Sequence, residues 1–291
     1  MLASIDQLFP PGPVVLDGAW GTELQARGLG SGECPDAWNL THPDRVEQVG
    51  RAYVAAGSQV ILTNTFGANR LRLEGYGLAA KVAEINRAGV EISRRATAGK
   101  ARVFASVGPS GKLLMMGDVT ESDLQAVFTE QMTALAAAGA DGIVIETMSD
   151  LVEAKMAQAA ARATGLPVVV SVVFDSGKQK DRTMMGATPE QVAAELTSAG
   201  ADVIGANCGQ GIAGYVPVCQ RLRGATDRPL WIKANAGLPE MIEGKPVYRT
   251  TPEQFARHVP ALVQAGARFI GGCCGTNPEF IQALKRALAL L

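Results

Sequence analysis

Short apolar runs alternate with longer amphipathic stretches along the whole chain. Each run ends in a turn rich in Gly, Asn, Asp or Thr, and successive runs start roughly 25 to 46 residues apart. This is the spacing that a strand–helix–strand unit needs. The predicted strands are Val14–Asp17, Val60–Asn64, Arg102–Val107, Gly142–Glu146, Pro167–Phe174, Val203–Cys208, Leu230–Ala234 and Phe269–Cys273.

The stretches between these runs have the apolar period of helices. Asp44–Ala56 and Ser122–Ala138 each place apolar residues on one face, and Ala79–Ala96 is the predicted main helix of the second unit. Thr188 before Pro189 is typical of a helix N-cap followed by proline at the first helical position. Ala-Gly pairs before four of the strands are typical of helix C-caps.

Eight strand–helix alternations are the number found in a (β/α)8, or TIM, barrel. An open, doubly wound sheet is the structural alternative. We favour the barrel because the polar residues that end the predicted strands are spread over many strands and do not gather at one switch point. No linker or low-complexity stretch divides the chain, so we expect an α/β fold with one (β/α)8 barrel domain over residues 1–291.

Composition limits the classes of partner. Charged residues make up 19% of the chain and the formal net charge is −1, which argues against nucleic acid or an anionic membrane as a partner. The N-terminal segment lacks the features of a secretory signal, and no apolar stretch approaches the length of a membrane span. The odd number of cysteines, five, fits a reducing compartment. The sequence therefore predicts a cytoplasmic protein.

Active sites of such barrels lie at the C-terminal ends of the strands. Polar residues at or just after the predicted strand ends are therefore the candidates, and we expect them to point into one mouth. They are Asp17, Asn64, Thr65, Ser106, Glu146, Thr147, Asn207, Cys208, Asn235, Cys273 and Cys274.

Three of these candidates are thiols, Cys208, Cys273 and Cys274, each next to glycine at a strand end. Three thiolates are a ligand set for a soft metal, and they favour zinc over magnesium or calcium. We expect no histidine in the set, since His42 precedes the helix after the first strand and His258 lies within a predicted helix. The alternative is that Cys208 is a small core residue and that the vicinal pair forms a strained disulfide or inert thiols.

Zinc with three thiolate ligands and one open position is better suited to binding a thiol than to activating water. A free alkyl thiol has a pKa of about 8.5 and is mostly protonated at neutral pH. Binding would ionise it and hold a nucleophilic sulfur, whereas the uncharged thioether product would bind weakly and leave. The three cysteines therefore predict S-alkylation of a small thiol, in which Cys34 and Cys219 take no part.

Several motifs resemble the zinc-dependent homocysteine S-methyltransferase family, from about Val14 to the C-terminal helix. They are DGAWGT at 17–22, TNTFGA at 63–68, GANC at 205–208 and GGCCGT at 271–276. Three further stretches resemble the homocysteine module of cobalamin-dependent methionine synthase within that family. These are SVGPSGK at 106–112, IETM at 145–148 and DRTMMG at 181–186.

The resemblance implies a barrel that holds one Zn²⁺ ion on Cys208, Cys273 and Cys274. It implies that homocysteine is activated as a zinc-bound thiolate, which is the fourth ligand, and is methylated to methionine.

The resemblance also implies a set of substrate-binding residues. Asp17 and Glu146 would bind the ammonium group of the substrate, and backbone amides would bind its carboxylate. The same pocket would be lined by Asn64, Thr65, Asn207 and Asn235. Simpler roles stay open, because Asp17 could cap the backbone of its glycine-rich turn and the asparagines could satisfy loop backbone.

The methyl donor is not determined by the sequence. The chain has no sequence left for a folate barrel or a corrinoid domain, so we expect either a small sulfonium or ammonium compound or a separate methyl-corrinoid (methylcobalamin) protein. A cationic donor would need an aromatic cage. The candidates for one are Trp20, Trp38, Phe66, Tyr76 and Phe174.

Two alternative functions belong to other classes. One is a zinc methyltransferase that acts on a different small thiol or selenol. The other is a non-catalytic zinc barrel that docks a corrinoid protein.

Overall fold

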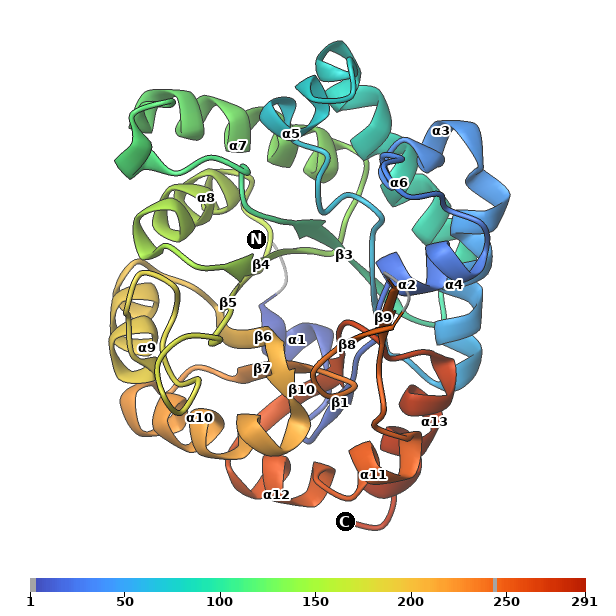
Figure 1. Cartoon of the computed structure of the whole chain (residues 1–291), viewed down its shortest axis with the longest axis vertical. Coiled ribbons are helices and arrows are strands. Elements are labelled where there is room, and N and C mark those ends of the chain that lie inside the picture. The colour runs from blue at the N-terminus through green and yellow to red at the C-terminus, as the bar shows by residue number, and fades with distance from the viewer. Residues whose placement is uncertain (1–3, 243–244) are drawn as a thin grey trace.

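The computed structural model describes residues 4–242 and 245–291. Eight parallel strands form a nearly closed barrel in the order β1-β10-β7-β6-β5-β4-β3-β2, with helices around it (Figure 1). The strands are β1 Val14–Val15, β2 Val60–Leu62, β3 Arg102–Val107, β4 Gly142–Met148, β5 Val168–Val172, β6 Val203–Gly211, β7 Leu230–Asn235 and β10 Ala267–Gly272. The predicted (β/α)8 barrel is therefore confirmed, and the open doubly wound sheet is wrong.

The helices also match the predicted pattern. They are α1 Ile5–Leu8, α2 Gly21–Ala26, α3 Trp38–Thr41, α4 Pro43–Ala56, α5 Arg70–Glu74, α6 Val82–Thr97, α7 Glu121–Ala137, α8 Leu151–Ala163, α9 Pro189–Ser198, α10 Ile212–Ala225, α11 Pro252–Ala256, α12 Val259–Gln264 and α13 Pro278–Leu288, with 3-10 turns η1 Ala79–Lys81 and η2 Leu114–Met116. Thr188 caps α9 as predicted, with its side chain accepting from Gln191 N–H. One placement is wrong: His258 is the N-cap of α12, in the turn after α11, because Pro260 in the first turn starts a new helix there.

The end of the barrel nearest α1 is filled by apolar side chains. Phe9, which follows α1, packs edge-on against Phe269 with ring centroids 5.3 Å apart, and Trp231 stacks against Phe269 at 5.5 Å. Both Trp231 and Phe269 are fully buried. This packing closes the N-terminal end of the barrel, so the open end is the one where the strands finish.

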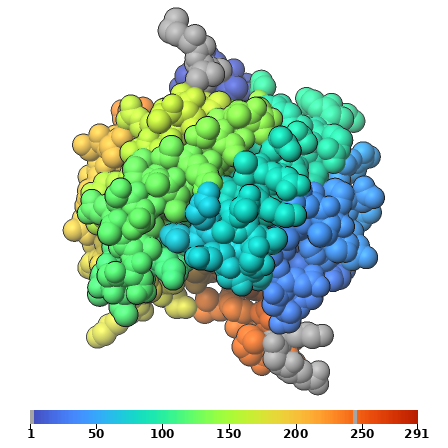
Figure 2. Space-filling view, turned by 90° about the horizontal axis from the view of Figure 1, so that it is seen from above, coloured from blue at the N-terminus to red at the C-terminus, as the bar shows by residue number. Residues whose placement is uncertain are grey.

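The loops at the C-terminal end of the barrel carry an added hairpin, β8 Glu240–Ile242 and β9 Lys245–Val247, which follows β7. In Figure 2 this orange segment projects from the end of the molecule opposite to the N-terminal helix α1. Within the two described ranges, no helix is both long enough and apolar enough to cross a membrane.

The seam between β1 and β2 is closed partly by side chains. The Gln59 N–H donates to Val15 O at 2.7 Å, and the Ser58 hydroxyl donates to Leu16 O at 3.1 Å. Further along, the Leu62 N–H donates to Asp17 Oδ2 at 2.7 Å. The carboxylate of Asp17 thus accepts a hydrogen bond from the backbone of β2 across this seam.

Candidate metal centre and substrate pocket

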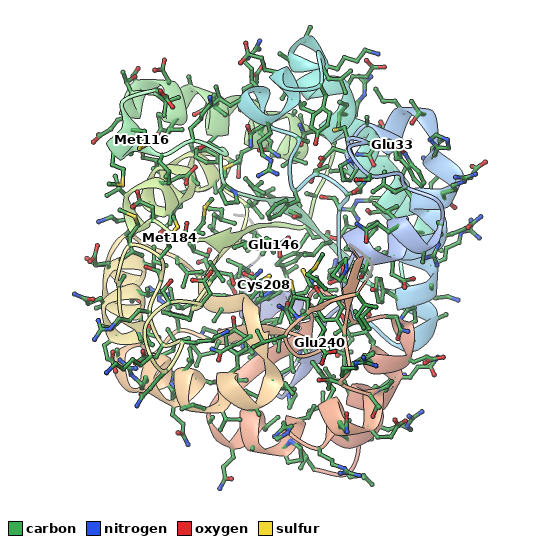
Figure 3. The ribbon with its side chains drawn as sticks, viewed as in Figure 1. Glu33, Met116, Glu146, Met184, Cys208 and Glu240 are labelled. Atoms are coloured by element: carbon green, nitrogen blue, oxygen red, sulfur yellow. The ribbon has the colours of Figure 1, made fainter. Side chains whose placement is uncertain are left out.

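Cys208, Cys273 and Cys274 meet at the mouth of the barrel, as predicted. Their Sγ atoms all lie within 4.8 Å of one another, and Cys208 Sγ is 3.8 Å from Cys274 Sγ. All five cysteines are free thiols, which excludes the vicinal disulfide in this structure. Figure 3 places Cys208 near the barrel centre, close to Glu146.

The vicinal pair is held by a tight turn at the end of β10. The Cys273 N–H donates to Ala234 O at 2.7 Å, which ties the turn to β7. Gly275 adopts φ +79°, and a Cβ atom at this position would lie 2.2 Å from the ring of Tyr248. The turn therefore needs glycine both for its left-handed backbone and for the close approach of Tyr248.

Asn207 connects the thiols to the neighbouring strands. Its Oδ1 accepts from the Thr147 N–H at 2.9 Å and from the Ser171 hydroxyl at 2.7 Å. Its Nδ2 donates to Thr147 Oγ1 at 2.7 Å and lies 3.9 Å from Cys273 Sγ. Thr147 and Cys208 both have φ +62°, a strained conformation for residues with a side chain. Asn207 is fully buried, so it supports the site from behind the thiols.

The thiol cluster has the donor chemistry of a soft-metal site. Hydrogen bonds from the thiols of Cys273 and Cys274 lower the pKa of Cys208 far below its usual value. The hydrogen bond to Cys208 in turn raises the pKa of Cys273. Three sulfur donors without imidazole or carboxylate fit a thiophilic ion such as Zn²⁺.

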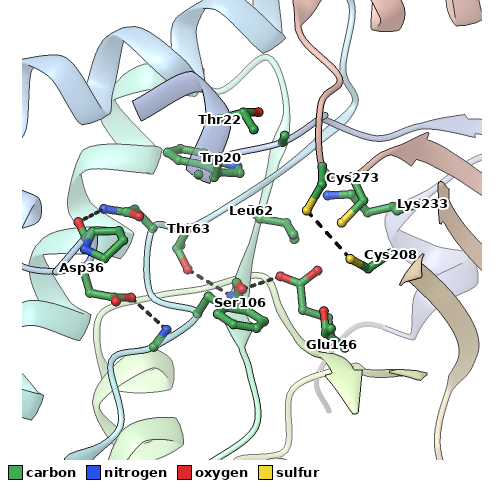
Figure 4. Close-up of a pocket in the computed structure, with 18 of the residues that line it drawn as sticks. Trp20, Thr22, Asp36, Leu62, Thr63, Ser106, Glu146, Cys208, Lys233 and Cys273 are labelled. Atoms are coloured by element: carbon green, nitrogen blue, oxygen red, sulfur yellow. Dashed lines mark hydrogen bonds between the residues drawn. The ribbon is translucent and has the colours of Figure 1, made fainter. Parts of the chain in front are cut away.

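A cavity of about 280 Å³ opens beside the thiols. Figure 4 shows Glu146 and Lys233 on the same side of it as Cys208 and Cys273, with Trp20 on the other side.

The six predicted substrate residues separate into two groups. Asn64 and Glu146 line the cavity together with the thiols. Four others lie behind its wall and are buried, namely Asp17, Thr65, Asn207 and Asn235.

Glu146, on β4, is the acidic residue next to the thiols. It is 8% exposed, and its Oε1 accepts a hydrogen bond from the Ser106 hydroxyl at 2.5 Å. Burial raises the pKa of Glu146, while the positive charge of Lys233 opposes that rise. A cationic group of a bound molecule would be stabilised beside this carboxylate.

Asp17 is engaged by the protein itself. Its Oδ1 lies 2.5 Å from Lys233 Nζ, and its Oδ2 accepts from Trp20 Nε1 at 2.7 Å and from the Leu62 N–H at 2.7 Å. Lys233 is not among the residues predicted from the sequence, although a lysine within the apolar run Leu230–Ala234 indicates a buried charge that needs a partner.

Three of the predicted substrate residues have side chains that bond to the protein's own backbone or lie outside the cavity lining. The Thr65 hydroxyl donates to Ser106 O at 2.7 Å, and Asn64 Nδ2 donates to Pro35 O at 2.8 Å. Asn235 Oδ1 is buried without a hydrogen-bond partner among the described residues, although the Asn235 side chain helps to lower the pKa of Cys208.

The cavity is also lined by a carboxyl group that is not among the predicted residues, that of Asp36. Asp36 lies in the loop after β1 and accepts from the Gly67 N–H at 2.9 Å. Burial raises its pKa to about 6. Asp36 could not be predicted from its position at a strand end, because it lies many residues after β1. Only the tertiary structure shows that this loop folds back to the cavity.

The aromatic residues predicted for a cation cage also separate into a group that lines the cavity and a group that lies in the core. Trp20, Phe66 and Tyr76 line the cavity, whereas Trp38 and Phe174 are buried in the core. The guanidinium of Arg72 lies over the Phe66 ring, 5.6 Å from its centroid, and lines the same cavity.

The fold and the site together define a class: a (β/α)8 barrel with a three-cysteine cluster, able to bind a metal ion, at its C-terminal mouth. The family model described as Homocysteine S-methyltransferase matches residues 14–288 of this sequence. The chain therefore belongs to the homocysteine S-methyltransferase family, which places it among methyltransferase enzymes.

Individual relatives agree with this assignment. Proteins named methionine synthase from Mycobacterium leprae and Mycobacterium tuberculosis are both 30% identical over 95% of this chain. The chain spans 24% of the length of each. Among solved structures, the metallated form of the homocysteine methyltransferase MmuM from Escherichia coli matches with a TM-score of 0.78 and 27% identity, over 95% of this chain and 96% of that one. The oxidized form of MmuM matches with a TM-score of 0.77 and 28% identity, over 94% and 95%.

Proposed function

We propose that this chain transfers a methyl group to the sulfur of homocysteine and so forms methionine. The observation that carries the proposal is the meeting of three free thiols within 4.8 Å at the edge of the cavity. Cys208, Cys273 and Cys274 would hold one Zn²⁺ ion. When bound, this ion supplies the positive charge that lets the acceptor thiol lose its proton at neutral pH.

The transfer itself is a substitution at carbon. The acceptor sulfur forms the new S–CH3 bond, the bond between methyl and donor breaks, and the donor keeps that electron pair. The thiol proton leaves to solvent before the transfer. The protein contributes by holding the acceptor and donor in line, which lowers the entropic part of the barrier.

The cavity walls suggest how the acceptor lies. The Glu146 carboxylate, close to the thiols, faces the amino group of the acceptor. On the opposite side, Thr22 Oγ1 is buried without a hydrogen-bond partner among the described residues and lines the same cavity. A free hydroxyl in this position offers a donor to the acceptor's carboxylate.

We assign the methyl donor to a separate corrinoid-carrying protein that docks on the mouth. Large apolar side chains are exposed on the loops after β3, β5 and β7. Groups of exposed apolar side chains often mark a surface that binds another protein. The exposed side chains here are Met115 and Met116, Met184 and Met185, and Leu238, Met241 and Ile242, between 41% and 72% exposed. Flexible, polarizable methionines are common at protein-binding surfaces.

A small cationic donor is the second candidate. Trp20, Phe66 and Tyr76 line the cavity and provide aromatic faces for a cation. The guanidinium of Arg72 over the Phe66 ring opposes this, because it already covers that face and repels a second cation.

A donor screen tests the proposal. Zinc-loaded protein is incubated with homocysteine and, in separate reactions, methylcobalamin, betaine, S-methylmethionine or S-adenosylmethionine, and methionine is measured. Methionine from methylcobalamin supports the corrinoid donor, and methionine from betaine or a sulfonium donor overturns it. A zinc-loaded protein that makes no methionine with any donor but methylates another thiol or selenol would have a different acceptor.

The non-catalytic alternative is tested at the metal. X-ray absorption at the zinc edge counts sulfur neighbours before and after homocysteine is added. A fourth sulfur neighbour that appears only with homocysteine supports the enzyme, whereas an unchanged set supports a structural site.

A further inference from the structure

A serine on β3 holds the carboxylate at the acceptor end of the cavity. The Ser106 hydroxyl donates to Glu146 Oε1 at 2.5 Å (Figure 4). Ser106 is 2% exposed and lines the cavity together with Glu146. Among the described residues, Oε2 of this carboxylate accepts no hydrogen bond. One oxygen of Glu146 is therefore fixed by the protein, and the other is open to a bound molecule.

Two threonines that follow β2 fix the backbone of Ser106. The Ser106 N–H donates to Thr63 Oγ1 at 3.0 Å, and the Thr65 hydroxyl donates to Ser106 O at 2.7 Å. The two threonine hydroxyls lie 2.5 Å apart. Since the one proton of the Thr65 hydroxyl is used on Ser106 O, Thr63 is the donor between them. This ring of hydrogen bonds satisfies the backbone of Ser106 and leaves its hydroxyl proton for Glu146.

The direction of the Ser106 hydrogen bond favours a charged Glu146. A hydroxyl that donates to a carboxylate stabilises its negative charge. Burial raises the pKa of Glu146, and the Lys233 charge and the Ser106 hydrogen bond oppose that rise. The Lys233 ammonium pairs with Asp17 at 2.5 Å, and within the described part of the chain it forms no ion pair with Glu146. A buried carboxylate held in one orientation is suited to binding an ammonium group.

We infer that Ser106 is the positioning residue that makes the pocket selective for thiols that carry an amino group. It acts through Glu146, because its hydroxyl holds Oε1 so that Oε2 meets the ammonium group of the acceptor. This inference rests on the proposed function, in which Glu146 faces that amino group. It goes further by naming the acceptor class, α-amino thiols, and the residue on which their selection depends.

Loss of this hydrogen bond should weaken only the part of binding that depends on the amine. A hydrogen bond to a charged group typically contributes about 10- to 100-fold to an equilibrium constant. Without it, the Glu146 carboxylate is free to turn, and its negative charge loses a hydrogen-bond donor. The sulfur and the carboxylate of the acceptor bind to other groups, so their contributions should stay the same.

The test compares homocysteine with 4-mercaptobutyrate, which is homocysteine without its amino group. Isothermal titration calorimetry on zinc-loaded protein gives the two dissociation constants. We expect their ratio, 4-mercaptobutyrate over homocysteine, to exceed about 100 in the natural protein. Ser106→Ala should lower this ratio at least about tenfold, through weaker binding of homocysteine alone. An unchanged ratio in Ser106→Ala, including one in which both thiols lose affinity equally, overturns the proposal.

Ser106→Ala should fold, because the N–H and C=O of residue 106 keep their partners Thr63 and Thr65. Ser171→Ala is the matched control. Ser171 is a fully buried serine on β5 whose hydroxyl donates to Asn207 Oδ1 at 2.7 Å, and it does not line the cavity. The ratio should stay at its natural value in this control, and a fall as large as that in Ser106→Ala overturns the proposal.

Glu146→Gln shows whether Ser106 acts through the carboxylate. This substitution removes the charge that binds the amine, so the ratio should fall. Adding Ser106→Ala should then change the ratio by less than about twofold, as expected when one residue acts only through the other. A further fall of about tenfold in the double variant would mean independent roles and overturns the proposal. The same comparison decides the case if Ser106→Ala alone is unfolded, because the double variant has no buried charge that lacks its donor.

The two proposals fail separately. The expected ratios without methionine from any donor overturn the proposed function alone. Methionine formation together with a ratio that Ser106→Ala leaves unchanged overturns the role of Ser106 alone. A ratio below about 100 in the natural protein overturns the contact between Glu146 and the amine, and with it the role of Ser106. Methyl transfer itself is still decided by the donor screen.

Discussion

Asn207 provides the sharpest test of how the metal centre is supported. Replacement by alanine removes three short hydrogen bonds, to the Thr147 N–H, the Thr147 hydroxyl and the Ser171 hydroxyl. A typical net contribution is about 1 kcal/mol each, and the buried Thr147 N–H that loses its acceptor adds about 1 to 3 kcal/mol. We expect Asn207→Ala to lower the free energy of unfolding by about 4 to 6 kcal/mol.

The same substitution should weaken zinc binding. Asn207 Nδ2 lies 3.9 Å from Cys273 Sγ, and groups that orient metal ligands from behind typically contribute about 10- to 100-fold in metal affinity. Urea unfolding measures the stability, and competition with a chromophoric chelator measures the zinc affinity. Ser171→Ala, which removes only one of the hydrogen bonds, is the control and should cost about 1 kcal/mol. A loss of less than about 1 kcal/mol in Asn207→Ala, with unchanged zinc affinity, would refute the reasoning.

Three further predictions follow from single residues. Cys273→Ala should abolish zinc binding with the fold retained by circular dichroism, whereas Cys219→Ala, in α10 with its pKa raised to about 12 by burial, should leave zinc content unchanged. Gly275→Ala should weaken zinc binding, since its Cβ would lie 2.2 Å from the Tyr248 ring; full affinity in this variant would contradict the close packing. The folded-state pKa of Asp36, about 6, lies above its ordinary value of 3.8, so its favourable contribution is present below pH 3.8 and is lost as the pH rises through 6. In urea titrations Asp36→Asn should remove a pH-dependent change on the order of 3 kcal/mol, and an identical pH profile would count against it.

The strands could be predicted because their signal is local. Each of the eight predicted runs overlaps a barrel strand, and Arg102–Val107 matches its bounds fully. Apolar runs of this length, separated by helical periods, allow few other arrangements. The thiol cluster could also be predicted from the sequence, because parallel strands bring their C-terminal ends to one edge regardless of their separation in sequence.

The substrate pocket was predicted less completely. The rule of strand ends selects residues by position, but it does not say which of them face the cavity and which are used by the protein. Asp17 illustrates the limit, since its partners Leu62 and Lys233 come from β2 and β7. No local pattern indicates that a lysine 216 residues away will neutralise this carboxylate.

The sequence by itself therefore determined the barrel, the order of its elements and the cysteines that meet at its mouth, because these depend on local periodicity and on the rules of parallel sheets. Only the tertiary structure decided the charge balance of the pocket. That balance depends on which side chains from distant strands come within a few ångströms after the barrel closes, and electrostatic interactions of buried groups change steeply over such distances.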